Sequence, residues 1–267
     1  MARAGFCALL LCLTLGANPA VAADGSDDTS VELGVYFWGA GVYGNIDTPE
    51  GEFSNNTEFS DIWDNLSGAF MAHGRFQTGD FSVVSDVMYV DIETDRKHKT
   101  VRLGPNDGIR IAADAKFELK NWIVDLTGGY KIFELDDVTL KPRGELYAGG
   151  RYWYLKPEVD VNVSGPLNSL SRKIDPKEQW VDAIVGARFA LALSPTVELS
   201  VQGDAGGFGI GNSSEFAWMQ MTALSWHFTE SWRLHLAYKF LQFRRDTGDI
   251  EIKEQYRGPI IATSFVF

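Results

Sequence analysis

The chain has 267 residues, including 17 Phe, 9 Tyr, 8 Trp and 27 Gly, and its formal net charge is −12 at pH 7. This acidic balance argues against nucleic acid as a partner, because binding a phosphate backbone needs clustered positive charge. The many aromatic residues and glycines favour a protein built from strands and turns.

Residues 1–22 have the pattern of a cleaved secretory signal peptide. Arg3 supplies the positive charge, an apolar segment runs from Gly5 to about Ala17, and Ala20-Val21-Ala22 forms a cleavage box. The apolar segment is too short to cross a bilayer as a helix. We therefore expect export with cleavage after Ala22.

Cys7 and Cys12 are the two cysteines, and both lie inside the predicted signal peptide. The mature chain then has no cysteine, which excludes disulfides. A lipoprotein signal at Cys12 is the less favoured alternative, because Leu11 stands where a small residue is required. Residues 23–30 are predicted to be a solvated periplasmic lead. No later run of about 18 apolar residues predicts a membrane-spanning helix.

Ten segments of the mature chain alternate apolar and polar residues with a period of two, which predicts β-strands with one apolar face. Between residues 231 and 246, for example, Trp232 and Leu234 alternate with Arg233 and His235. The predicted strands are residues 31–46, 67–77, 80–94, 109–134, 144–157, 179–193, 197–210, 214–228, 231–246 and 251–267.

The lengths of the predicted connections alternate along the chain. Those after the second, fourth, sixth and eighth strands are short, and those after the first, third and fifth are long and polar. With an even number of strands, this pattern predicts an all-β fold: a closed antiparallel up-and-down transmembrane β-barrel of the outer membrane, with both termini on the periplasmic side. Because hydrocarbon cannot satisfy a free sheet edge, the first strand should pair with the tenth. The barrel would cover residues 31–267, and a soluble periplasmic β-protein is the alternative.

Two stretches depart from regular alternation. Residues 59–66 predict a Ser-capped helical turn, which would be either a plug in the barrel mouth or, preferably, an element of a surface loop. In the strand 109–134, Phe117 and Leu119 lie on the opposite face from Trp122 and Val124. A β-bulge near residues 120–121 would reconcile the two halves; otherwise the first half stands clear of the membrane.

Aromatic residues on the apolar face are expected to contact outer-membrane lipid as an interfacial girdle. The residues are Trp122, Trp218, Trp226, Trp232, Tyr238 and Phe267. A final Phe on an amphipathic strand also resembles the signal by which outer-membrane barrels are handed to their insertion machinery, so that machinery is an expected partner.

Five stretches resemble a group of uncharacterised Gram-negative outer-membrane β-barrel proteins. They are Phe59–Leu66, Asp86–Asp91, Gly150–Leu155, Gly203–Gly209 and the approach from Gly258-Pro259 to Phe267. The resemblance covers most of the mature chain. It implies the fold and the location only, and no activity follows from it.

The polar face supplies the candidate site residues, which would point into the lumen. They are Glu32, His73, Arg75, Asp86, Asp125, Lys131, Glu145, Arg151, Asp182, Arg188, Glu198, Asp204, Arg233, His235 and Lys239. Seven acids, six bases and two histidines nearly balance. Because an unpaired buried charge is very costly, we expect a lumen filled by ion pairs rather than an open pore.

The preferred function is therefore a structural, surface-interaction or narrow-permeation role in the outer membrane, with an unidentified extracellular partner. The alternative is an outer-membrane hydrolase of lipid or peptide, with His73, Asp86, Ser225 and His235 as candidates. If the turn 229–231 pairs Phe228 with Trp232, Ser225 faces His235, and a Ser–His pair can act as nucleophile and base. The sequence contains no metal-binding spacing, and no cofactor is predicted.

Overall fold

The computed structural model describes residues 29–48, 51–94, 97–103, 109–135, 138–164, 169–174, 177–248 and 251–267. The predicted signal peptide lies outside these residues, as does most of the predicted lead. The last two residues of that lead, Thr29 and Ser30, already belong to the first strand.

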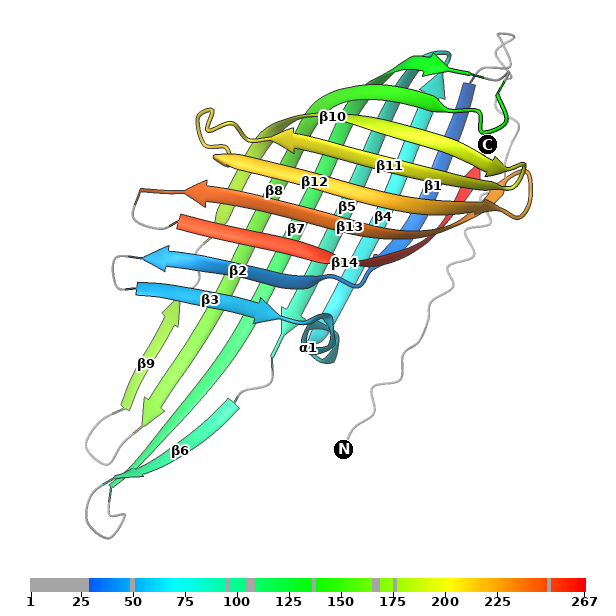
Figure 1. The fold of residues 1–267 in the computed structure, drawn as a ribbon. Coiled ribbons are helices and arrows are strands. Elements are labelled where there is room, and N and C mark those ends of the chain that lie inside the picture. The colour runs from blue at the N-terminus through cyan, green and yellow to red at the C-terminus, as the bar shows by residue number, and fades with distance from the viewer. Residues whose placement is uncertain are drawn as a thin grey trace, which may run out of the picture.

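Ten antiparallel strands close into a barrel (Figure 1). They are β1 (Thr29–Trp38), β4 (Leu66–Thr78), β5 (Phe81–Glu93), β7 (Ile109–Glu134), β8 (Arg143–Ser164), β10 (Glu178–Ser194), β11 (Val197–Gly206), β12 (Phe216–His227), β13 (Trp232–Asp246) and β14 (Glu251–Val266). Each pairs with the next, and β1 pairs with β14, where Leu33 lies opposite Phe265. The predicted fold class is confirmed.

Side chains alternate between the outside and the inside of this wall. On the outside, Val181, Val185 and Leu236 each expose more than half of their surface, whereas Arg151 and Asp182 on the inside are fully buried. A soluble protein would bury the first set and solvate the second. Compared with a soluble protein, the placement of apolar and charged side chains is reversed, as a lipid-facing wall requires.

Strand pairs extend the barrel at one end, where the sequence predicted polar loops (Figure 1). β2 (Gly41–Thr48) pairs with β14 and with β3 (Gly51–Thr57), β6 (Lys97–Leu103) pairs with β7, and β9 (Ser169–Ile174) pairs with β8. The loop prediction was wrong for β3, β6 and β9, because a strand beyond the lipid needs no apolar face; most of β2 falls within the predicted strand 31–46. We call this end the hairpin end and the opposite one the short-turn end.

The predicted strand 31–46 is two strands, β1 and β2, which separate at Gly39 and Ala40. There the backbones of β1 and β14 approach closely: the Gly39 N–H donates to the Pro259 carbonyl at 2.9 Å. A Cβ on Gly258 would lie 2.0 Å from the Gly39 carbonyl oxygen. The contact allows the chain to leave β4 and to continue along β14 as β2.

The predicted bulge at residues 120–121 of β7 is also wrong. Pairing with β5 continues in register from Tyr130 to Glu118, and the shift against β8 falls between Lys131 and Phe133 instead. Leu119 therefore keeps its inward position, where it lines a small apolar cavity with Ile62. The alternative, that the first half of β7 stands clear of the membrane, stays a prediction.

Ile62 belongs to α1 (Phe59–Asp64), a short helix at the hairpin end. Its N-cap is Glu58, whose side chain makes no capping hydrogen bond, so the predicted Ser cap is wrong. The predicted strand 197–210 ends early, at Gly206, because Gly207 and Phe208 both take positive φ and turn the chain. Among the described residues, no helix is long and apolar enough to cross a bilayer.

Candidate functional site: the barrel interior

An apolar layer fills the barrel interior toward the hairpin end. Its members come from nine of the ten barrel strands. They are Trp38, Met71, Met88, Ile123, Trp153, Trp180, Ala217, Met219, Leu241, Phe243, Tyr256 and Ile260. Because a single contact cluster reaches almost every strand, it spans the cross-section of the barrel.

Three aromatic rings form the centre of the apolar layer. Trp153 and Trp180 stack with their ring centroids 5.6 Å apart and their planes at 13°. The Phe243 ring lies 4.8 Å from that of Trp153 and 5.3 Å from that of Trp180. Trp153 and Phe243 are fully buried, so the three rings form a closely packed centre.

Asp182 fixes these rings and a loop at the same time. Its fully buried carboxylate accepts hydrogen bonds from Trp153 Nε1 at 2.8 Å, from the Ser214 amide at 2.7 Å and from Ser214 Oγ at 2.8 Å. Trp180 Nε1 donates to Ser214 Oγ at 2.8 Å. The sequence placed Asp182 in an ion network; its hydrogen-bond donors in the structure are neutral groups. Ser214 thereby anchors the loop of residues 207–215 to the barrel interior.

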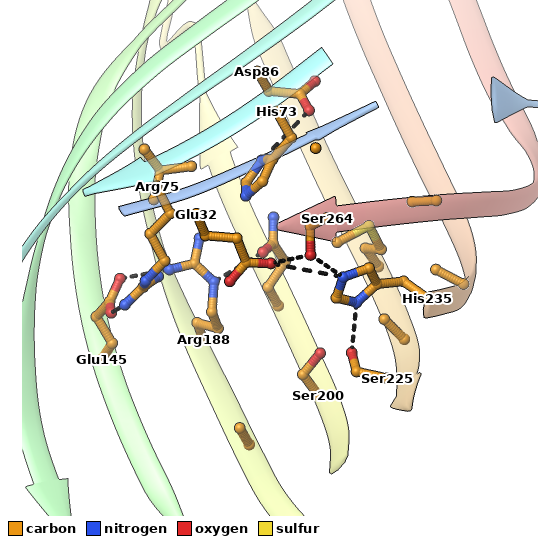
Figure 2. Close-up of a pocket in the computed structure, with 18 of the residues that line it drawn as sticks. Glu32, His73, Arg75, Asp86, Glu145, Arg188, Ser200, Ser225, His235 and Ser264 are labelled. Carbon is orange, nitrogen blue, oxygen red and sulfur yellow. Dashed lines mark hydrogen bonds and ion pairs between the residues drawn. The ribbon is translucent and has the colours of Figure 1, made fainter. Parts of the chain in front are cut away.

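A polar cavity of about 390 Å³ occupies the other half of the interior. It reaches the short-turn end, where Glu134, Arg143 and His227 line it. Most of the candidate site residues predicted from the sequence surround this cavity, and Figure 2 shows part of its wall.

Arg151 is the most deeply buried cation of the interior. Its guanidinium binds Asp125 through two hydrogen bonds of 2.8 and 2.9 Å, and Asp204 through two of 3.1 and 3.0 Å. Tyr147 donates to the Asp204 carboxylate at 3.2 Å. Such bidentate pairs satisfy the charges of all three side chains.

Glu145 collects a second group of partners. Arg75 and Arg188 both bind its carboxylate, and Ser82 donates to it at 3.0 Å. Arg188 also donates through Nε to Gln202 at 3.0 Å. Arg188 lies directly opposite Glu145 on the neighbouring strand, and Figure 2 shows Arg75 and Arg188 beside the Glu145 carboxylate.

Asp86 is the centre of a third group. Tyr36 donates to its carboxylate at 2.8 Å, while His73 Nδ1 and Lys239 Nζ lie 3.9 and 3.8 Å from it. Lys239 also lies over the Trp38 ring, 5.0 Å from its centroid, which joins the polar cavity to the apolar layer.

Glu32 and His235 form a fourth group with two serines. Arg233 binds Glu32 at 2.7 Å, and Ser264 Oγ donates to the other Glu32 oxygen at 2.7 Å. His235 lies between Ser264, 2.8 Å from Nε2, and Ser225, 2.8 Å from Nδ1. Ser225 and His235 are paired residues of β12 and β13, as the turn prediction required.

The remaining predicted lumen residues lie at the short-turn end. Lys131 contacts Asp80 at 3.4 Å and Glu134 at 2.7 Å, and Glu198 binds Arg143 at 2.7 Å. Arg143 and the hydroxyl donors Tyr36, Tyr147 and Ser264 were absent from the sequence prediction. Strand parity could have found them, but a search for charge alone passes over neutral hydroxyls.

Aromatic side chains gather outside the wall near both ends. Trp232 and Phe265 lie 5.1 Å apart at the short-turn end, and Phe37 of β1 packs against Phe59 and Trp63 of α1. Of the predicted lipid-facing set, Trp218 is half-buried and the others are exposed, namely Trp122, Trp226, Trp232, Tyr238 and Phe267. Two aromatic girdles around an apolar belt are characteristic of bilayer-spanning barrels.

Comparison with solved structures agrees with this description. The chain is similar to the outer-membrane protease OmpT of Escherichia coli, with 8% identity and a TM-score of 0.52 over 90% of this chain and 97% of that one. It also matches the translocator domain of the autotransporter NalP of Neisseria meningitidis, with 11% identity and a TM-score of 0.43 over 91% of this chain and 90% of that one. At 8% identity, the likeness to OmpT concerns the fold alone. No family model and no curated protein matches the chain.

The closed wall, the apolar belt and the charged interior together define the class: an integral β-barrel of the outer membrane. Its outer face lies in lipid. β1 begins and β14 ends at the short-turn end. In outer-membrane barrels the end with the short turns faces the periplasm.

Proposed function

We propose that this protein is a sealed outer-membrane barrel, which carries extended strands on the outer side of the membrane and does not conduct solutes. The apolar layer carries the proposal, because it joins side chains from nine of the ten barrel strands into one buried cluster. Water and ions would have to pass three closely packed aromatic rings, whose faces offer them no hydrogen-bonding partners.

The charged residues around the polar cavity are proposed to stabilise the barrel rather than to guide ions. Glu145, for instance, is bound by both Arg75 and Arg188, which leaves its carboxylate little capacity to bind a passing cation. Mutual pairing of this kind closes a lumen, whereas a selective pore needs weakly held charges that exchange with water.

The strands beyond the barrel are the proposed site of surface interaction. β7 and β8 have 26 and 22 residues, far more than the 9 to 11 or so that a tilted strand needs to cross a bilayer. Together with β6 and β9 they form a sheet that projects from the barrel (Figure 1). We infer that this sheet meets an extracellular partner.

A liposome-swelling assay tests the seal. Proteoliposomes of the wild-type barrel should swell in arabinose no faster than empty liposomes. The double variant Trp153→Ala, Phe243→Ala should swell faster, because it removes two of the three central rings. Trp226→Ala is the matched control, since it removes an indole from the lipid-facing side. Swelling by the wild type at the rate of the double variant would refute the proposal.

We also infer that the chain reaches this location by export and assisted insertion, with cleavage after Ala22 and recognition of β14 by the insertion machinery. In support, Phe265 contacts both Trp232 and Phe267 outside the wall, at 5.1 and 4.7 Å. Deletion of Phe267 should lower the amount of folded protein in the outer membrane, and the mature protein should begin at Ala23. A mature chain that still contains Cys12 would contradict the export step.

A further inference from the structure

Four neighbouring strands align a chain of polar groups on the wall of the polar cavity. Ser225 on β12, His235 on β13, Ser264 on β14 and Glu32 on β1 are joined by hydrogen bonds of 2.8, 2.8 and 2.7 Å (Figure 2). Arg233 holds the far side of Glu32 at 2.7 Å. We call the four residues the serine–histidine relay.

Each hydrogen bond in this relay has a defined donor and acceptor. Ser264 donates its single hydroxyl proton to Glu32, so it must accept the hydrogen bond that joins it to His235. The proton of neutral His235 is therefore on Nε2, and Nδ1 offers a lone pair. Ser225 Oγ lies 2.8 Å from Nδ1, so its O–H points at a base.

This is the arrangement that activates a serine. A nucleophilic serine needs a base within hydrogen-bond reach, and the base needs a third group that fixes its tautomer. His235 meets the first requirement, and Ser264 with Glu32 meets the second. The third group could not be identified from the sequence, because it comes from two strands that are distant in the chain.

The surroundings allow a small substrate to approach. Ser225, His235 and Ser264 all line the polar cavity, which reaches the periplasmic end. Its volume of about 390 Å³ is at the small end of the range for ligand sites. Glu198 lies directly opposite Ser225 and is paired with Arg143 at 2.7 Å, which brings a positive charge to the same side of the cavity.

We propose that Ser225 is the nucleophile of a periplasm-facing esterase site that accepts short-chain acyl esters. Ser225 Oγ attacks the acyl carbonyl carbon while its proton passes to His235 Nδ1. Arg143 stabilises the negative charge on the carbonyl oxygen. The C–O bond to the alcohol then breaks, and the alcohol leaves with the proton from Nδ1. Water repeats the sequence on the acyl-serine and releases the carboxylic acid and the free hydroxyl.

In this mechanism Ser225 and His235 are catalytic, while Ser264 and Glu32 are positioning residues that act through the imidazole. The proposal goes beyond the sealed-barrel function and does not depend on it. A site of this kind would operate equally in a barrel that leaks, because substrate and water both enter from the periplasmic end.

The test uses the folded, full-length barrel in detergent micelles with two probes. A fluorophosphonate should form an O–P bond to Ser225 with loss of fluoride, which adds the reagent mass less HF to the peptide that contains Ser225. 4-Nitrophenyl acetate should release one equivalent of nitrophenolate in a burst. Ser225→Ala and His235→Gln should each lower the burst rate by at least about 100-fold, the usual range for loss of a general base. Ser264→Ala should lower kcat about tenfold with KM unchanged.

Ser200→Ala is the matched control, because Ser200 lines the same cavity and has no hydrogen bond to His235 among the described contacts. It should react within about twofold of the wild type, on the scale expected for a residue outside the reaction. Heat-modifiable gel mobility verifies that each variant is folded. If the folded wild type takes up no fluorophosphonate, or if Ser225→Ala reacts as fast as the wild type, the esterase site is refuted. Either result leaves the sealed-barrel proposal intact, since neither probe measures permeation.

Discussion

The Asp182 carboxylate and the Ser214 hydroxyl lie 2.8 Å apart and are both fully buried. Asp182 belongs to the barrel wall and Ser214 to the loop of residues 207–215. This contact therefore joins that loop to the apolar layer, and through Trp153 and Trp180 it sets the position of two of the three central rings.

Ser214→Ala should lower the free energy of unfolding by about 1–3 kcal/mol, because it removes one of the three donors to the buried Asp182 carboxylate and leaves Trp180 Nε1 without its hydrogen-bond acceptor. Urea unfolding followed by tryptophan fluorescence measures the change. Ser60→Ala on α1 is the control, since Ser60 is exposed. Equal stability of the two variants would contradict the role given to the Asp182–Ser214 contact.

Arg151→Met should be among the most destabilising substitutions of the lumen. It leaves Asp125 and Asp204 as neighbouring buried charges without a cation, at a cost of about 3–5 kcal/mol. Arg244→Met is a matched control, because the Arg244–Glu215 pair is half exposed and such pairs contribute about 0–1 kcal/mol. Equilibrium unfolding in lipid vesicles measures the free energy of unfolding of both variants. Equal losses of stability would show that the buried Arg151 pairs contribute no more than an exposed ion pair.

Charge on the lipid-facing side should destabilise the barrel according to depth. Val185→Arg places a guanidinium near the middle of β10, at a cost of about 2–4 kcal/mol. Ile210→Arg also changes an exposed apolar residue, but it lies in the 207–215 loop beyond the lipid and should cost little. The yield of heat-modifiable protein after folding into bilayers distinguishes them; equal yields would argue against a lipid-facing belt.

Gly258→Ala tests the crossing of β1 into β2. The added methyl group would lie 2.0 Å from the Gly39 carbonyl oxygen, and the backbone must shift, at a cost of about 1–3 kcal/mol. Gly68→Ala is the control, since a Cβ there has no atom within 4 Å. Unfolding midpoints of the two variants measure the difference, and a Gly258 variant as stable as the control would mean that the close approach is not required.

Much of the wall could be predicted from the sequence, because a strand in lipid must alternate strictly. The period of two gave the ten barrel strands, and the placement of Arg151 inside and Val181 outside follows from it. The strands β6 and β9 escaped prediction because they leave the lipid, where a polar segment can pair without an apolar face. Polarity alone therefore made them resemble loops.

The interior was harder to predict, because parity places a residue inside without saying what it touches. Trp153 and Phe243 lie on the inward face by parity, yet only the register between strands shows that they meet in one layer. The Ser225–His235 contact could be predicted from the sequence, since one short turn joins β12 and β13 and fixes their register. The partners Ser264 and Glu32 required the closure of β14 on β1, which no local pattern specifies.

The conductance of the wild-type barrel in a planar lipid bilayer tests the central claim most directly. A barrel sealed by Trp153, Trp180 and Phe243 should insert without steady current in 1 M KCl, and Trp153→Ala with Phe243→Ala should open stepwise conductance. Stable single-channel currents from the wild type, unchanged when these two rings are removed, would show that ions pass by another route and that the apolar layer is not a seal.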